Sequence, residues 1–166
     1  MMTVVNPHPH LEVLVGIPGS GKTTFAAHRR SHTPALHIVS TDVIREQLYP
    51  GYEEGRIRHH FIDHRLIFRL AYHELSDALQ QGHDVLFDAT SLTVRRRHKL
   101  ILLGRRYGAM IIAHYFPIPL GVAFHRNRGR ARQVPRGAMM QMAGLLEPPT
   151  TAEGFDRVIV HRHTGR

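Results

Sequence analysis

One octet of the sequence has the residue types and spacing that suit phosphate chemistry. Residues 16–23 read Gly-Ile-Pro-Gly-Ser-Gly-Lys-Thr and match the pattern Gly-x4-Gly-Lys-Ser/Thr in full. In this pattern the backbone N–H groups at a helix N-terminus wrap a β-phosphate, the lysine bridges the β- and γ-phosphates, and the hydroxyl ligates Mg²⁺. We therefore expect a site for ATP or GTP with Mg²⁺, formed by Gly16, Pro18, Gly19, Ser20, Gly21, Lys22, Thr23 and Thr24.

The octet contains a lysine, although the chain uses arginine at nearly all of its basic positions. The sequence has 22 lysines and arginines, and only Lys22 and Lys99 are lysine. An ammonium is a compact point charge that fits between two phosphates, where a planar guanidinium does not. The residue type at position 22 therefore supports the phosphate-binding interpretation.

Two carboxylates follow short apolar runs of the sequence. Asp42 comes after the run 36–39, and Asp88 closes the run 85–87. Ligands of open α/β sheets bind at the carboxyl ends of the strands, so both residues are candidates. Asp42 can also be a helix N-cap, a role compatible with chemistry. An acidic residue that closes an apolar strand needs a partner, and for Asp88 this is expected to be Mg²⁺, its waters or the Thr23 hydroxyl.

An arginine-rich segment in the final third supplies cations for phosphoryl transfer. Arginine occupies positions 126, 128, 130 and 132, followed by Arg136. In a helix Arg126 and Arg130 share one face, whereas Arg128 and Arg132 point roughly 200° away. One pair can therefore reach a γ-phosphate, where cations stabilise the transition state, and the other pair is expected to be solvated.

A second basic cluster, Arg95-Arg96-Arg97-His98-Lys99, opens a predicted helix. Cations at a helix N-terminus oppose the macrodipole, so an anionic acceptor is one reason for them, and an exposed charged turn is an equal alternative. The fifteen histidines are scattered and are interpreted mostly as surface residues. The nearest approach to a metal motif, His60-x-x-Asp63-His64, lacks the glutamate of the zinc pattern.

Alternating apolar runs and helical patterns predict the elements that position these residues. The five predicted strands cover 11–16, 36–39, 85–87, 110–116 and 158–160. The predicted helices follow the octet and cover 57–79, 93–107, 120–130 and 136–145. This alternation predicts an α/β fold with three layers, a parallel sheet of about five strands with helices on both faces. Residues 1–10 are expected to form a flexible tail, and residues from about 120 to 145 an arginine-bearing lid with its adjoining helices.

Composition limits the class of protein. A chain of 166 residues is expected to be one domain, and the absence of cysteine excludes a disulfide framework, a thiolate metal site and a cysteine nucleophile. The N-terminus has no signal-peptide pattern and no apolar run reaches the roughly 18 residues of a membrane span, so we expect a cytoplasmic enzyme without a membrane partner. The formal charge of +9 favours polyanionic partners such as nucleic acid.

Several motifs occur together in a characteristic order. They are the octet with Thr24, Asp42-x-x-Arg45, Asp88-Ala-Thr90, Arg126-Asn-x-x-Arg130, Val134-Pro135 and Glu153-Gly-Phe-Asp156. In this order the chain resembles the 5′-hydroxyl polynucleotide kinase branch of P-loop kinases, over nearly its whole length. It departs from that pattern at Ser91, where such kinases often carry asparagine, and we expect it to work without the phosphatase, ligase or HD domain often fused to them. The resemblance implies a stand-alone kinase domain with a separate phosphatase or ligase partner.

The resemblance also implies a role for each matching residue. Asp42 would be the general base for the 5′-OH, and Arg45 would hold the neighbouring phosphate of the acceptor. Arg130 would be the lid arginine that stabilises the transferring phosphoryl group, with Arg126 beside the nucleotide. Asp88 would assist the metal or the acceptor pocket. Thr90 and Arg97 complete the expected acceptor-binding set.

Three functions stay open on these residues. The first is ATP-dependent phosphorylation of the 5′-hydroxyl end of DNA or RNA. The second is a small-molecule kinase of the same fold, acting on a nucleoside, an antibiotic or a sugar nucleotide. The third is a nucleic-acid-associated ATPase in which Asp42 is only a helix cap. An open acceptor pocket lined by Arg45 and arginines 95 to 97 would favour a polymer, and a closed apolar pocket a small molecule.

Overall fold

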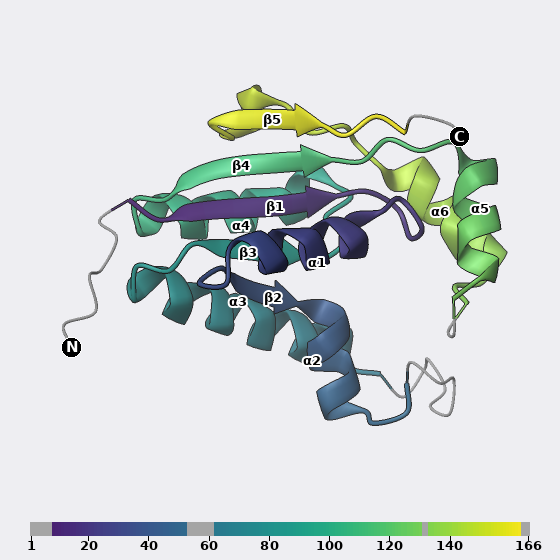
Figure 1. Cartoon of the computed structure of the whole chain (residues 1–166), viewed down its shortest axis with the longest axis horizontal. Coiled ribbons are helices and arrows are strands. Elements are labelled where there is room, and N and C mark those ends of the chain that lie inside the picture. The colour runs from purple at the N-terminus through teal and green to yellow at the C-terminus, as the bar shows by residue number, and fades with distance from the viewer. Residues whose placement is uncertain (1–7, 53–61, 131–132, 164–166) are drawn as a thin grey trace.

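A computed structural model describes residues 8–52, 62–130 and 133–163 and contains one five-stranded sheet (Figure 1). The strands are β1 (His10–Val15), β2 (His37–Ser40), β3 (Val85–Asp88), β4 (Met110–Tyr115) and β5 (Arg157–Val160). Their order is β2-β3-β1-β4-β5, and every neighbouring pair is parallel. The predicted α/β fold with a five-stranded parallel sheet is confirmed.

Helices cover both faces of the sheet and its carboxyl edge. The helices are α1 (Lys22–His32), α2 (Thr41–Leu48), α3 (His64–Gln80), α4 (Val94–Arg106), α5 (Leu120–Arg128) and α6 (Arg136–Leu145), with a short 3-10 turn η2 (Thr151–Glu153). In Figure 1, α1 lies in front of the sheet and α3 and α4 behind it, while α5 and α6 lie where the strand arrows end. Loops at that carboxyl edge are therefore enclosed by α2, α5 and α6.

The central strand β1 is buried on both faces. Leu11, Val13 and Val15 belong to the core cluster under α3 and α4, whereas Leu14 belongs to the cluster under α1. Successive side chains of a strand point to opposite faces, so one strand supplies both cores. The loop at residues 16–21 thus follows a central strand that is buried on both faces.

Most element ends lie within one residue of the sequence-based expectations, but two helix ends and the expected N-terminal tail differ from them. Helix α3 begins at His64, because the Asp63 carboxylate caps it by accepting from the backbone N–H groups of residues 65 and 66; the earlier part of the predicted helix, residues 57–61, lies outside the described residues. Helix α5 ends at Arg128 and not at residue 130, since Gly129 is its C-cap. Residues 1–7 of the expected tail are also outside the described residues, but His10 already belongs to β1 and its backbone N–H donates to Asp84 at 2.8 Å.

No described helix combines the length and the apolar character needed to cross a lipid bilayer.

Candidate active site

The loop between β1 and α1 depends on glycine at two positions. Gly19 and Gly21 have φ angles of 83° and 104°, a region that side chains other than glycine rarely adopt. A Cβ at position 19 would also lie 2.9 Å from the Ala123 carbonyl oxygen of α5. The loop therefore takes a conformation in which it contacts α5 closely, and α1 begins directly after Gly21 with its N-terminal N–H groups facing the loop.

Lys22 is buried at the centre of this loop. Its side chain is only 7% exposed, and Nζ donates to the Ile17 carbonyl at 2.8 Å and to Ser20 Oγ at 3.2 Å. Burial lowers the pKa of Lys22 to about 8; the negative charges of Asp88 and Asp42 oppose this shift, and the positive charge of Arg130 adds to it. The four charged groups are thus close enough to influence one another.

The two candidate carboxylates lie at neighbouring strand ends. Ser40 pairs with Asp88 in the register of β2 and β3, and the Thr41 hydroxyl donates to the Asp88 backbone carbonyl at 3.4 Å. Strand β3 is adjacent to β1, whereas β2 is one strand further out. Burial raises the pKa of the Asp88 carboxyl, and the charge of Lys22 opposes that rise. Within the described residues, this carboxylate has no hydrogen-bond or ion-pair partner.

Asp42 is not a helix cap. The N-cap of α2 is Ser40, whose hydroxyl accepts from the Val43 backbone N–H, so the cap-only alternative for Asp42 is wrong. The Asp42 carboxylate is 56% exposed and forms an ion pair with Arg45, whose side chain is 12% exposed. The Arg45 guanidinium in turn lies 5.3 Å from the centre of the Tyr52 ring. A carboxylate with one fixed cation and one free side therefore faces the open part of the site.

One cavity of about 1520 Å³ collects most of the predicted site residues. Its lining includes Pro18, Gly19, Ser20, Gly21, Lys22, Thr23, Thr24, Asp42, Arg45, Asp88, Thr90, Arg96, Arg126 and Arg130. Gly16 lies just beneath it, where its N–H donates to the Thr90 carbonyl at 3.1 Å. A Cβ on Gly16 would approach Ser20 Oγ to 2.6 Å, so this glycine is needed for the packing of the loop.

The structure corrects the prediction that Arg97 contacts an acceptor. Arg97 is fully buried and forms a bidentate pair with Glu153 of η2, with both N–O distances at 2.8 Å. Its Nη1 donates to the carbonyls of Ser91 and Leu92 at 3.0 and 2.9 Å. Each helix residue turns about 100°, so position 97 points into the protein while Arg96 points into the cavity and Arg95 into solvent.

One pair of arginines in the arginine-rich segment 126–136 lines the cavity, although helix α5 does not extend to the second of them. Arg126 and Arg130 line the cavity and Arg128 does not, while residue 132 lies outside the described residues. Arg130 follows the end of α5. Arg126 Nη1 donates to the Gly19 carbonyl at 3.4 Å, and Nη2 lies 3.1 Å from His163 Nδ1.

Asn127 connects the two ends of the loop that follows α5. The sequence alone did not indicate this role. Its buried side chain donates through Nδ2 to the Val134 carbonyl at 2.8 Å and accepts through Oδ1 from the Val134 N–H at 3.0 Å. These two bonds close the loop that carries Arg130. An asparagine between two arginines was the only available signal, and its pairing with Val134 needs the fold.

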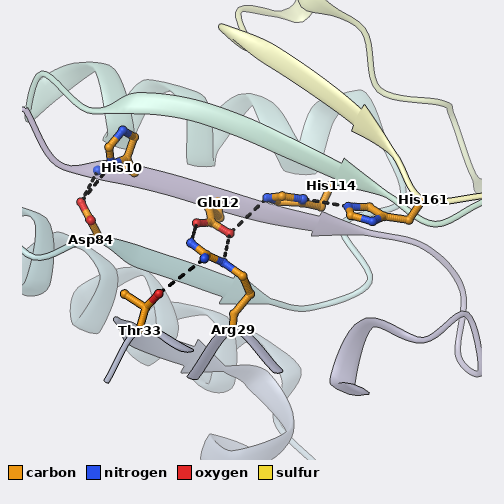
Figure 2. Close-up of polar contacts among 7 residues, drawn as sticks. All are labelled: His10, Glu12, Arg29, Thr33, Asp84, His114 and His161. Carbon is orange, nitrogen blue, oxygen red and sulfur yellow. Dashed lines mark hydrogen bonds and ion pairs between the residues drawn. The ribbon is translucent and has the colours of Figure 1, made fainter. Parts of the chain in front are cut away.

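A buried polar network beside the loop was missed by the sequence reasoning (Figure 2). Glu12, 5% exposed on the central strand, forms an ion pair with Arg29 of α1 and lies 3.1 Å from His114 Nε2. His114 Nδ1 lies 2.9 Å from Nε2 of His161, which lines the cavity. Burial favours protonation of Glu12, but His114 and Arg29 outweigh it and hold its pKa at about 2.

The aromatic surroundings of His161 give this network a defined position at the cavity wall. The His161 ring stacks on Phe116 with centroids 4.5 Å apart and planes 9° apart. Burial, together with the charge of His114, lowers the pKa of His161. His114 is an exception to the expectation that the histidines lie mostly at the surface. The signal in the sequence was a single acidic residue, Glu12, inside an apolar run.

Comparisons with known proteins agree with this arrangement. A family model described as AAA domain matches residues 11–149. Among solved structures, the chain is similar to a protein of the Pnkp1/Rnl/Hen1 RNA repair complex, with 25% identity and a TM-score of 0.70 over 90% of this chain but 47% of that one, so it spans about half of that protein.

Two further solved structures match over most of their own length. A fungal RNA kinase matches with 17% identity and a TM-score of 0.68, covering 98% of this chain and 78% of that one. A gluconokinase from Sinorhizobium meliloti 1021 matches with 16% identity and a TM-score of 0.64, covering 95% and 85%. At these identities the likeness shows a shared fold. The chain belongs to the AAA domain family and is a P-loop kinase-like domain.

Proposed function

We propose that the protein transfers the γ-phosphate of ATP to the 5′-hydroxyl end of a polynucleotide. One observation carries the proposal: a single cavity holds the phosphate-binding loop, the Asp42–Arg45 pair and two lid arginines. A volume of about 1520 Å³ exceeds the roughly 300–1,000 Å³ of an ordinary ligand pocket, which suits a donor and an acceptor bound together.

On the donor side the residues bind the phosphates and balance their charge. The N–H groups at the start of α1 bind the β-phosphate, and Lys22 exchanges its present oxygen partners for β- and γ-phosphate oxygens. Arg130 and Arg126 close over the γ-phosphate from the α5 side. Positive charge in this position stabilises the transition state, in which negative charge spreads over the transferring group.

On the acceptor side Asp42 receives the proton of the attacking hydroxyl. Its free oxygen faces the cavity, while Arg45 holds the carboxylate in place and lies where the next phosphate of a strand would sit. A positioned general base of this kind contributes about 10²–10⁴-fold to the rate. Thr90, at the end of the Asp88-Ala-Thr segment, contacts the acceptor from the β3 side.

Thr23 and Asp88 are the residues that would hold Mg²⁺. The Asp88 carboxylate is largely desolvated and unpaired within the described residues, which fits a cation nearby. No three histidine, aspartate or glutamate residues in the described ranges gather as a metal cage, and this fits a magnesium ion that keeps waters and phosphate oxygens as ligands. When bound, the ion would neutralise the negative charge that develops on the leaving group.

The alternative acceptor is a small hydroxylated molecule. The gluconokinase similarity supports it, because that protein shares the fold over most of both chains. The cations at the acceptor side of the cavity, Arg45 and Arg96, support the polynucleotide instead. Gluconate offers one carboxylate for two guanidinium groups, whereas a nucleic-acid strand offers a phosphate for each.

The test uses ATP labelled at the γ-phosphate, Mg²⁺, DNA and RNA oligonucleotides with 5′-OH ends, and gluconate. We expect label at the 5′ end of an oligonucleotide and a loss of about 10²–10⁴-fold in kcat for Asp42→Asn. Asp77→Asn, an exposed carboxylate on α3, is the matched control and should keep its activity. Labelling of gluconate alone would contradict the polynucleotide acceptor, and an active Asp42→Asn would contradict the assignment of the base.

A further inference from the structure

The seam between α3 and α4 begins inside the cavity and leaves it along the outside of the protein. Both helices start at the carboxyl edge of the sheet and lie on the same face, in contact with each other. Phe68 of α3 and Arg96 of α4 line the cavity, and the seam continues away from it with Tyr72 and Lys99. The surface outside the cavity is therefore continuous with its acceptor side.

Cations cover aromatic rings along this seam. The Arg96 guanidinium lies 5.7 Å from the centre of the Phe68 ring, and Lys99 Nζ lies 4.1 Å from the centre of the Tyr72 ring. Burial raises the pKa of Tyr72, and the charge of Arg96 opposes that rise. The rings hold the long basic side chains along the seam, so these side chains lose less conformational entropy when they bind a ligand.

Further cations stand on both rims of the seam. Arg65 and Arg69 are one turn apart on α3, next to the stripe that carries Phe68 and Tyr72, and Arg95 stands at the start of α4; all three are exposed. We call the set Arg65, Arg69, Arg95, Arg96 and Lys99 the basic seam. In the described part of the chain none of these five forms an ion pair with a carboxylate.

The carboxylates of α3 lie on its other side. Glu74 pairs with His37 of β2 at 2.9 Å, and Asp77 pairs with His73 at 2.9 Å. Arg95 and Arg96 also sit at the N-terminus of α4, where the macrodipole disfavours positive charge. The Glu147 carboxylate accepts from the Val94 N–H at this helix start and offsets part of that cost. Five cations without an ion-pair partner in the described residues still favour an anionic ligand, and a ligand that meets all of them extends beyond the cavity.

We propose that the basic seam binds the sugar-phosphate backbone of the acceptor strand downstream of its 5′ end. This proposal rests on the proposed function and assigns it a polymer acceptor. From Arg96 to Arg106, α4 extends about 15 Å beyond the cavity, at about 1.5 Å per residue. A single strand that leaves the cavity past Arg96 meets Lys99 and Arg69 next, and these phosphate contacts place the strand without reading its sequence.

The test compares acceptors of two lengths and two pairs of substitutions. The seam variant is Arg69→Gln with Lys99→Gln, neither of which lines the cavity; the control is Arg30→Gln with Arg157→Gln, two exposed arginines elsewhere that remove the same charge. KM is measured for a 5′-OH 12-mer and for a nucleoside 3′-phosphate, and affinity for the 12-mer is measured by fluorescence anisotropy between 50 and 200 mM salt. Anionic phospholipid vesicles form a third arm.

For the seam variant we expect KM for the 12-mer to rise about tenfold or more, and the slope of log K against log salt to shrink by about 1.4, which is about 0.7 for each of two lost phosphate contacts on a single strand. KM for the nucleoside 3′-phosphate should not change, and the control should match the parent. Equal 12-mer kinetics in seam and control variants would overturn the seam while leaving the kinase function intact. If only vesicle binding is lost, the occupant is a lipid surface and the proposal is wrong. Failure of the parent to phosphorylate either acceptor would instead overturn the proposed function.

Discussion

The two arginine-rich segments of this chain, residues 95–99 and 126–130, are alike in composition but differ in which of their arginines are buried. In the segment that starts α4, Arg97 is fully buried against Glu153, Arg96 enters the cavity and Arg95 faces solvent. In the segment that ends α5, Arg126 and Arg130 face the cavity and none of the described arginines is buried. The α4 segment therefore contributes one arginine, Arg97, to the interior of the fold, whereas the described arginines of the α5 segment all stay accessible.

The difference comes from what each segment packs against. Helix α4 lies on the sheet, so the position that points inward must find an acid, and η2 supplies one. The end of α5 lies beside the phosphate loop, where Arg126 Nη1 donates to the Gly19 carbonyl, so Arg126 and Arg130 line the cavity and do not pack under the sheet. Residue type alone cannot separate a structural arginine from a functional one, and the following substitutions test the separation.

Arg130→Ala should have the largest effect. A lid arginine that stabilises a transferring phosphoryl group contributes about 10³–10⁵-fold in kcat, so we expect a loss of at least about 10³-fold. ATP affinity should change less, because the interaction is strongest in the transition state. Arg128→Ala is the matched control and should keep kcat within about twofold, with steady-state kinetics as the measurement. Equal losses in both variants would show that the lid acts only as a positively charged surface.

Arg97→Met should act on stability and not on chemistry. Removing one partner of a buried pair leaves Glu153 charged without a counterion, which costs about 3–5 kcal/mol in the free energy of unfolding. Urea unfolding measures this loss. The double variant Arg97→Met with Glu153→Gln should recover much of it, whereas Arg95→Gln should stay within about 0.5 kcal/mol of the parent. If Arg97→Met folds normally and raises KM for the oligonucleotide, the structural assignment of Arg97 is wrong.

Asn127→Ala should lower both stability and kcat, each by less than the preceding substitutions. The loss of two hydrogen bonds to Val134, each worth about 0.5–1.5 kcal/mol, should lower the free energy of unfolding by about 1–3 kcal/mol and release the loop that carries Arg130. We therefore expect kcat to fall more than ATP affinity. Asn127→Asp keeps the acceptor for the Val134 N–H and should lie between the parent and the alanine variant. Unchanged kcat in Asn127→Ala would show that Arg130 needs no such support.

The fold was predictable from the sequence because its signals are local. Short apolar runs predicted the five strands, two of which end at Gly16 and Asp88, and helical spacing of apolar residues predicted the longer helices between them. The ends of the helices were harder to predict. The Asp63 cap of α3 and the Gly129 cap of α5 moved two boundaries, since an aspartate or glycine near a helix end has several roles that only the surrounding structure separates.

The site was predictable where one motif carries the geometry. The octet and the strand-end carboxylates lie together because parallel strands end at one edge of a sheet. Arg97 was misassigned and the contacts of His114 were missed, because they depend on partners that are distant in sequence: Glu153 is 56 residues from Arg97, and the His114–His161 contact spans 47. Asn127 was missed although Val134 is only 7 residues away, because an asparagine in a loop can have many backbone partners. Long-range polar pairs leave no periodic pattern in a single sequence.

The pH dependence of ATP affinity should show a smaller difference between the two arginine segments. Burial lowers the pKa of Lys22 to about 8, and bound phosphates need the charged form, so ATP affinity should fall above pH 8 by up to about tenfold per pH unit. The charge of Arg130 contributes to the lowered pKa of Lys22. In Arg130→Gln the fall should therefore begin at higher pH, whereas in Arg97→Met with Glu153→Gln it should begin where it does in the parent. Isothermal titration calorimetry from pH 7 to 10 measures both.

The lowered pKa of Lys22 should also make the free energy of unfolding depend on pH, in the direction opposite to ATP affinity. The unfolded chain keeps the Lys22 proton up to the ordinary pKa of 10.5, while the folded protein releases it near pH 8. Between these values the unfolded state binds more protons, so the contribution of Lys22 to the free energy of unfolding rises with pH while ATP affinity falls. A Lys22→Met variant removes this contribution and serves as the reference for the unfolding series. If the parent and Lys22→Met show the same pH dependence of unfolding, the Lys22 pKa is not lowered, and the electrostatic coupling between the loop and the α5 arginine is absent.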